Sequence, residues 1–145
     1  MKNKMRILGI DYGEARVGTA ITDALNITAQ GLETIERKNS DKIVLKRLDE
    51  IMQMYEIDTI VVGMPLNMNG TKSERAEITE KFIHKLKCKY NKMKIETIDE
   101  RLTTVAAHKT MNFLDVNKNK KRNIVDTISA VYILETYLNK MKNLL

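Results

Sequence analysis

One stretch limits the possible folds more than any other: residues 57–65 read IDTIVVGMP and are almost continuously apolar. Such a run is typical of a strand that is covered on both faces of its sheet, because neither set of alternating side chains is polar. Apolar residues at helical spacing precede it over residues 39–56 and follow it to about residue 90. The combination predicts an α/β fold in which this strand is covered on both faces.

Three shorter strands are predicted before this run and one after it. MRILGID, RVGTAITD and AQGLETIER are separated by turn residues around Gly13 and Asn26, a pattern typical of an antiparallel meander. MKIETID, at residues 93–99, is the fifth strand. We therefore expect three antiparallel strands at the start of the chain and two strands that alternate with helices.

Helix ends are marked by capping residues. Asn39 or Ser40 is expected to cap the first helix, and Thr71 with Glu74 forms a capping box for the second. The chain closes with a short helix, a polar loop and a long helix, predicted over residues 103–111, 112–121 and 122–141. No repeat or linker divides the sequence, so residues 1–145 are expected to form a single domain.

The charge of the chain suits a polyanionic partner such as nucleic acid, since the net charge is +6 and the isoelectric point is near 9.4. Many lysine-rich proteins bind no polyanion, so charge alone leaves this open. Five Tyr, two Phe and no Trp disfavour an aromatic platform for stacked bases. The short apolar runs and the single cysteine predict a cytoplasmic protein without a membrane partner.

Several carboxylates stand at positions that are unusual for surface residues. Asp11 ends the first strand, and Asp99 and Glu100 end the fifth. Adjacent strand residues point to opposite faces, so only one of the last two is expected to lie with Asp11. Asp126 falls on the apolar arc of the final helix, where an ionised side chain is costly unless it is paired or binds a metal. Interaction with the helix N-terminus or with Arg122 is the alternative for Asp126.

Three carboxylates from distant parts of the chain repel one another unless a cation lies between them. Mg²⁺ and Mn²⁺ are hard cations that prefer oxygen ligands and also bind phosphates. Two such ions about 4 Å apart can activate water and stabilise the leaving oxygen in phosphodiester cleavage. The carboxylates therefore predict a divalent-metal site with Asp11 as a ligand.

Four blocks of the sequence resemble the signature blocks of the YqgF/RuvX family: GIDYGEARVGTAITD, VVGMPLNMNGT, DERLTT and KRNIVDTISAVYILETYL. The resemblance extends over essentially the whole chain. It implies an RNase H-like fold, in which a five-stranded mixed sheet has its first three strands antiparallel and is flanked by helices on both faces. It also implies that the catalytic and metal-binding residues are Asp11, Glu100 and Asp126.

The same resemblance implies an activity. It predicts a metal-dependent endonuclease that processes the 5′ end of precursor 16S rRNA. The cofactor is expected to be a pair of Mg²⁺ or Mn²⁺ ions. The partner is expected to be the RNA itself or a ribosomal particle that contains it. A Holliday-junction resolvase that cuts branched DNA uses the same chemistry and is one alternative. A non-catalytic nucleic-acid-binding module is another alternative. The sequence leaves the oligomeric state open between a monomer and a homodimer.

Seven further residues are candidates for substrate binding, each with a structural alternative: Arg16, Asn67, Gly70, Arg101, Lys120, Lys121 and Arg122. Arg16 can contact a phosphate or be a solvated turn residue. The asparagine and glycine can serve the turn of their own loop, and Arg101 can neutralise Asp99. The basic run before Asp126 can contact a nucleic-acid backbone or remain solvated. His84 and His108 lack metal-ligand spacing and are predicted to lie on the surface.

Overall fold

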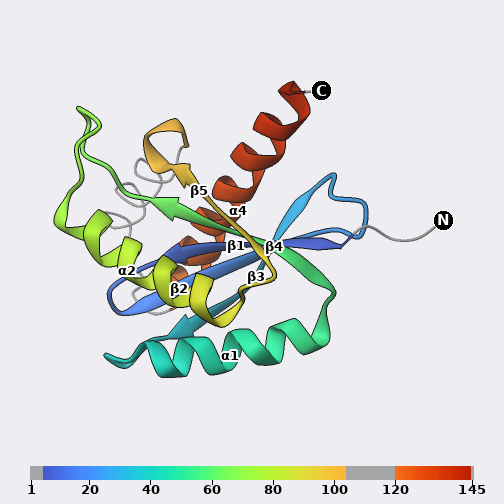
Figure 1. Ribbon diagram of the computed structural model, residues 1–145, viewed down its shortest axis with the longest axis horizontal. Helices are drawn as coiled ribbons and strands as arrows, with labels where there is room; N and C mark the ends of the chain where they lie inside the picture. The colour runs from blue at the N-terminus through green and yellow to red at the C-terminus, as the bar shows by residue number, and fades with distance from the viewer. Residues whose placement is uncertain (1–4, 104–119, 145) are drawn as a thin grey trace.

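The computed structural model describes residues 5–103 and 120–144, with the side chains of the last helix described from Thr127 onward. Five strands form one sheet in the order β3-β2-β1-β4-β5 (Figure 1). In chain order they are β1 (Arg6–Tyr12), β2 (Arg16–Thr22), β3 (Ala29–Glu36), β4 (Ile57–Met64) and β5 (Lys94–Asp99). The first three pair antiparallel, β4 runs parallel to β1, and β5 runs parallel to β4. The predicted mixed sheet is confirmed.

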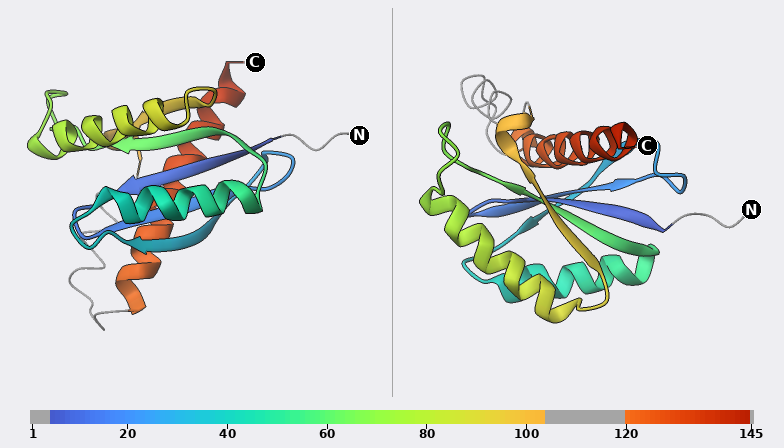
Figure 2. Two further views of the ribbon diagram at one scale, coloured as in Figure 1. Left: turned by 60° about the horizontal axis from the view of Figure 1, so that its bottom comes forward. Right: turned by 45° about the horizontal axis from the view of Figure 1, so that its top comes forward.

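Helices cover both faces of this sheet, as predicted (Figure 2). The elements are α1 (Asp41–Met54) and α2 (Glu74–Lys89) on one face, α4 (Lys120–Asn143) on the other, and a single 3₁₀ turn, η1 (Glu100–Leu102), after β5. Within the described part of the chain, no helix has the length and apolar character needed to span a membrane.

The last predicted elements differ in part from the structure. α4 begins at Lys120 rather than at residue 122, so Lys120 and Lys121 are helical and do not belong to a polar loop. The predicted helix over 103–111 lies almost entirely outside the described residues, and so does most of the predicted loop over 112–121.

One of the two predicted caps is correct. Ser40 caps α1, and its hydroxyl accepts a hydrogen bond from the backbone N–H of Lys42 at 3.2 Å. The capping box at Thr71 was wrong, because α2 is capped by Ser73, whose Oγ accepts from the N–H of Ala76 at 3.1 Å. The hydroxyl of Thr71 instead donates to Asn69 within the preceding loop, at 2.6 Å.

Two apolar layers lie on the two faces of the sheet, and β1 contributes to both. Leu8 and Ile10 face the layer under α1 and α2, whereas Ile7 faces the layer under α4. In β4, residues 60–62 are fully buried, which confirms the prediction of a strand covered on both faces. Burial of each such aliphatic side chain stabilises the fold by about 1.5–3 kcal/mol, so this strand anchors the whole sheet.

Candidate active site

Asp11 lies near the carboxyl end of β1 with only 4% of its surface exposed. Side chains alternate along a strand, so Asp11 projects to the same face as Ile7 and Gly9. That is the α4 face, because a Cβ at Gly9 would lie 2.5 Å from Cγ of Leu134. The structure therefore places this buried carboxylate between the sheet and the last helix.

Glu100 reaches the same face from the other side of the sheet. A Cβ added at Gly63 of β4 would lie 2.7 Å from Oε1 of Glu100 and 2.5 Å from Cδ1 of Ile133, a residue of α4. Gly63 directly follows Val62, the β4 residue that pairs with Ile10 of β1. The Glu100 carboxylate therefore lies over β4 at the level of Asp11, roughly one strand spacing of 4.8 Å away from β1.

Asp99 does not share this position, because both of its oxygens bind Arg101. The guanidinium donates to Asp99 at 2.6–3.1 Å, and the backbone N–H of Arg101 donates to Oδ1 at 2.9 Å. These bonds hold the pKa of the Asp99 carboxyl below its usual value. Asp99 thus caps η1 and pairs with Arg101, while Glu100 lies on the α4 face.

Asp126 belongs to α4, but its side chain lies outside what the structure describes. The helix crosses the strands of the sheet: a Cβ at Gly31 of β3 would lie 3.1 Å from Cβ of Thr127, and a Cβ at Gly9 of β1 would lie 3.1 Å from the Ala130 carbonyl oxygen. Thr127, which follows Asp126, thus lies over β3, and an approach of Asp126 to Asp11 is a prediction from the sequence. Among the described residues, no three His, Cys, Asp or Glu side chains are grouped closely enough to hold a metal ion. The three-carboxylate site remains a prediction.

The loop between β4 and α2 lies beside this edge of the sheet and is built around Asn67. Its N–H donates to the Thr71 carbonyl oxygen at 2.9 Å, and its side-chain amide donates to the Thr71 hydroxyl at 3.0 Å. Gly70 has a φ of +86°, a conformation that L side chains rarely adopt. Arg101 donates to the Met68 carbonyl oxygen at 3.2 Å, so the Asp99–Arg101 pair also holds this loop.

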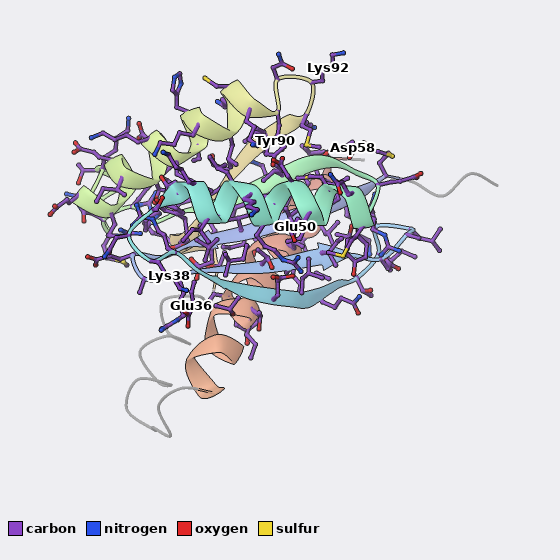
Figure 3. All side chains as sticks on the ribbon, turned by 90° about the horizontal axis from the view of Figure 1, so that it is seen from below. Glu36, Lys38, Glu50, Asp58, Tyr90 and Lys92 are labelled. Atoms are coloured by element: carbon purple, nitrogen blue, oxygen red, sulfur yellow. The ribbon has the colours of Figure 1, made fainter. Side chains whose placement is uncertain are left out.

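Arg16 opens β2 opposite Glu36 of β3, on the same face as Asp11. A hollow of about 250 Å³ lies here, lined by Ala15, Arg16, Glu36, Lys38 and Asn39. Figure 3 shows Glu36 and Lys38 close together at the end of β3 that leads into α1. A phosphate contact by Arg16 therefore remains a prediction, in a hollow that contains charges of both signs. The side chains of Lys120, Lys121 and Arg122 lie outside the description.

The predicted surface position of His84 is confirmed, whereas His108 lies outside the described residues. The Nε2 atom of His84 is 3.6 Å from Sγ of Cys88, one helical turn further along α2. Among the described residues, no third His, Cys, Asp or Glu side chain joins them as a possible metal ligand.

Sequence reasoning missed two residues that shape this edge. Gly63 interrupts a run of branched aliphatic residues, and a glycine inside a strand often marks a close approach by another group. Arg75 bonds the backbone of β1 from α2, a contact between residues 63 positions apart, for which we see no sequence signal.

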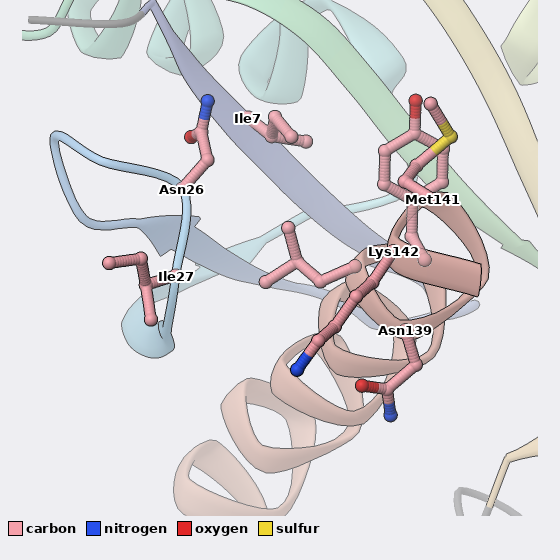
Figure 4. Close-up of a pocket in the computed structure, with 8 residues that line it drawn as sticks. Ile7, Asn26, Ile27, Asn139, Met141 and Lys142 are labelled. Carbon is pink, nitrogen blue, oxygen red and sulfur yellow. The ribbon is translucent and has the colours of Figure 1, made fainter. Parts of the chain in front are cut away.

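An apolar hollow lies at the opposite end of β1. It measures about 540 Å³ and is lined mainly by apolar side chains of β1, the β2–β3 turn and the end of α4 (Figure 4). Ile7 and Tyr137 line it, whereas Asp11 and Glu100 do not. The clustered carboxylates, and not this hollow, therefore define the candidate active site.

The chain is similar in sequence to a known protein family and to several relatives. The model of the RuvX family, described as "Holliday junction resolvase", matches residues 5–140. A protein of Ruminiclostridium cellulolyticum named "Putative pre-16S rRNA nuclease" is 53% identical over 137 residues, which cover 94% of this chain and 96% of that one. A protein of the same name from Acetivibrio thermocellus is 47% identical over 135 residues, covering 93% and 96% of the two chains.

Solved structures show the fold. Thermus thermophilus RuvC, in complex with a Holliday junction substrate, superimposes with a TM-score of 0.55 at 12% identity, covering 95% of this chain and 96% of that chain. A second Thermus thermophilus RuvC structure gives a TM-score of 0.52. The RNase H-like fold is thereby confirmed. With the family model matching nearly the full length and relatives near 50% identity, the chain belongs to the RuvX family of nucleases.

Proposed function

We propose that this protein is a divalent-metal-dependent endonuclease that hydrolyses phosphodiester bonds at the 5′ end of precursor 16S rRNA. One observation carries the proposal: the carboxylate of Glu100 lies over Gly63, beside the buried Asp11, on the face that α4 covers. The names of the close relatives support the choice of substrate. The activity belongs to a single domain, residues 1–145, acting in the cytoplasm on RNA or ribosomal particles.

Asp11, Glu100 and Asp126 would hold Mg²⁺ or Mn²⁺, most simply as a pair of ions. The donor set fits, because carboxylate oxygens are the ligands that these hard cations prefer. Two carboxylates on one sheet face at the same level also repel each other unless a cation lies between them. Ions bound there supply the activation of water and the stabilisation of the leaving oxygen.

The remaining candidate residues divide into two groups in this proposal. Arg16 and the basic run of Lys120, Lys121 and Arg122 contact phosphates, consistent with the net charge of +6. Asn67, Gly70 and Arg101 act indirectly, because their hydrogen bonds and backbone shape the loop beside the site.

A second function keeps the same chemistry but takes branched DNA as its substrate. The description of the RuvX family as Holliday junction resolvases favours it. A resolvase makes paired cuts and usually works as a symmetric dimer, so the oligomeric state bears on the choice.

The test offers the purified chain a precursor 16S 5′ leader and a four-way DNA junction, with Mn²⁺, Mg²⁺ or EDTA. Asp11→Asn, Glu100→Gln and Asp126→Asn are compared with Asp58→Asn, an exposed acid at the opposite end of the sheet. Metal-dependent cutting of the leader, lost in the three variants and kept in the control, supports the proposal. Symmetric cutting of the junction alone favours the resolvase. Binding of either substrate without cutting indicates a non-catalytic module.

A further inference from the structure

The end of β1 that carries Asp11 extends beyond its partner strand on one side. Pairing with β4 ends at Ile10, opposite Val62, whereas pairing with β2 continues through Asp11 and Tyr12. The N–H of Gly13 donates to the Arg16 carbonyl oxygen on the β2 side. Since the backbone groups of successive residues face opposite neighbours, the Tyr12 carbonyl faces the side where β4 pairing has ended.

A side chain bonds this carbonyl where β4 no longer pairs with β1. Nη2 of Arg75, near the start of α2, donates to the Tyr12 carbonyl oxygen at 2.9 Å. The same guanidinium lies 5.8 Å from the centre of the Tyr12 ring. One planar group therefore supports both the backbone and the ring of the residue that follows Asp11, a geometry that a lysine ammonium reproduces only in part.

The ring of Tyr12 is anchored on the opposite face of the sheet. Its hydroxyl donates to Oδ1 of Asp41 at 2.6 Å, and Asp41 also accepts from Arg37 and Lys85, each at 2.7 Å. Phe82 stacks on the ring with centroids 4.1 Å apart. The residue after Asp11 is thus held by its carbonyl, its ring and its hydroxyl.

We propose that Arg75, acting through Tyr12 and its anchor on Asp41, is a positioning residue that fixes the direction of the Asp11 carboxylate for metal binding. The inference rests on the proposed function, because it assigns Asp11 to a metal. Asp11 and Tyr12 share a peptide unit and project to opposite faces, so rotation of one requires rotation of the other. The contacts that hold Tyr12 on the α1 and α2 face therefore restrict the orientation of Asp11 on the α4 face.

The test compares Arg75→Gln, Arg75→Lys and Tyr12→Phe with Arg47→Gln, which removes an arginine of α1 that donates to Glu33 of β3 and to Glu50 of α1. Mn²⁺ affinity is measured by electron paramagnetic resonance without substrate, and kcat and KM are measured for leader cleavage. Arg75→Gln should weaken Mn²⁺ binding and lower kcat roughly 10-fold, since groups that orient metal ligands have effects of this order. KM should change little, Arg75→Lys should recover part of the loss, and Arg47→Gln should match the wild type.

Amide hydrogen exchange over residues 10–14 reports how firmly this segment is held, and it can be measured without metal. Exchange should be faster in Arg75→Gln and Tyr12→Phe than in the wild type and in Arg47→Gln. If Arg75→Gln fails to fold, Arg75→Lys and Tyr12→Phe decide the question by the same measurements. Wild-type Mn²⁺ binding and cleavage that persist unchanged in these variants would overturn the inference alone. A wild-type protein that neither binds Mn²⁺ nor cuts would overturn the proposed function instead.

Discussion

Glu100 lies across Gly63 so closely that a single added methyl group at that glycine would come within 2.7 Å of the glutamate Oε1. The two residues belong to different elements, η1 and β4, and the absence of a side chain on the strand is what leaves room for the carboxylate. The position of Glu100, a candidate metal ligand, thus depends on Gly63, which has no side chain that could bind a metal or a substrate.

Gly63→Ala should therefore reduce cleavage and stability together. The new Cβ would also lie 2.5 Å from Cδ1 of Ile133, and overpacking of this kind costs about 1–3 kcal/mol of unfolding free energy. Urea unfolding and leader cleavage measure the two effects.

The double variant Gly63→Ala with Ile133→Val separates these effects, because valine lacks the clashing Cδ1 atom. It should recover part of the stability without recovering activity, since the contact with Glu100 remains. Ile133→Val alone is the control, with an expected cost of about 0.5–1.5 kcal/mol. Recovery of activity in the double variant would show that displacement of Glu100 does not cause the loss.

Metal ions should stabilise the folded protein through the same carboxylates. Mn²⁺ at about 100 times its dissociation constant should raise the free energy of unfolding by about 2.7 kcal/mol. For a chain of this size, that corresponds to roughly 5–10 °C in melting temperature. The rise should disappear in Asp11→Asn and in Glu100→Gln and persist in Asp58→Asn, as measured by thermal melts with Mn²⁺ and with EDTA. An equal rise in all of the variants would place the metal elsewhere.

The two adjacent acids at the end of β5 should differ in their effect on activity. Asp99→Asn loses the ion pair with Arg101, whose guanidinium donates to the carboxylate at 2.6 Å, but it leaves the acid over Gly63 in place. We expect Asp99→Asn to retain most of the wild-type kcat, whereas Glu100→Gln should lose roughly 100-fold or more, as expected for loss of a charged group at the reacting centre. Single-turnover cleavage of the leader measures both. A larger loss of kcat in Asp99→Asn than in Glu100→Gln would assign the metal to Asp99.

Asp41 should make stability depend on pH. Burial alone would raise the pKa of its carboxyl, but the hydrogen bonds from Lys85, Tyr12 and Arg37 outweigh this and lower it. A carboxyl with a lowered folded pKa stabilises the protein above its unfolded pKa of about 3.9 and loses this contribution as the pH falls through the folded value. The stability difference between wild type and Asp41→Asn should therefore be full at pH 6 and shrink below about pH 4. Urea unfolding at pH 6, 4 and 3 tests this, and a constant difference would contradict it.

Much of the fold follows from local pattern. The apolar run in β4, the helical spacing before and after it and the short strands at the start of the chain predicted the element order and the antiparallel first strands, because period and turn residues act over a few positions. The mixed five-stranded sheet was implied by the family resemblance. Local rules failed where two groups compete for one partner. Thr71 had the spacing of a helix cap, yet its hydroxyl bonds Asn69, and Ser73 caps α2 in its place.

Residue types and spacing identified Asp11 and the acidic pair at the end of β5 as candidates, since a charge at the end of a core strand is visible in sequence alone. Strand alternation left the choice within the pair open and the family resemblance favoured Glu100, but only the tertiary structure shows how this residue reaches the face of Asp11. Strand register puts Ile98 beside Gly63 and Asp99 beside Met64, so Glu100 crosses β4 where no side chain blocks it, and Asp99 turns to Arg101. Arg75 became visible only when α2 was packed against the end of β1. The physical reason is common to both: contacts between residues tens of positions apart depend on register and packing, which the local pattern of a sequence does not specify.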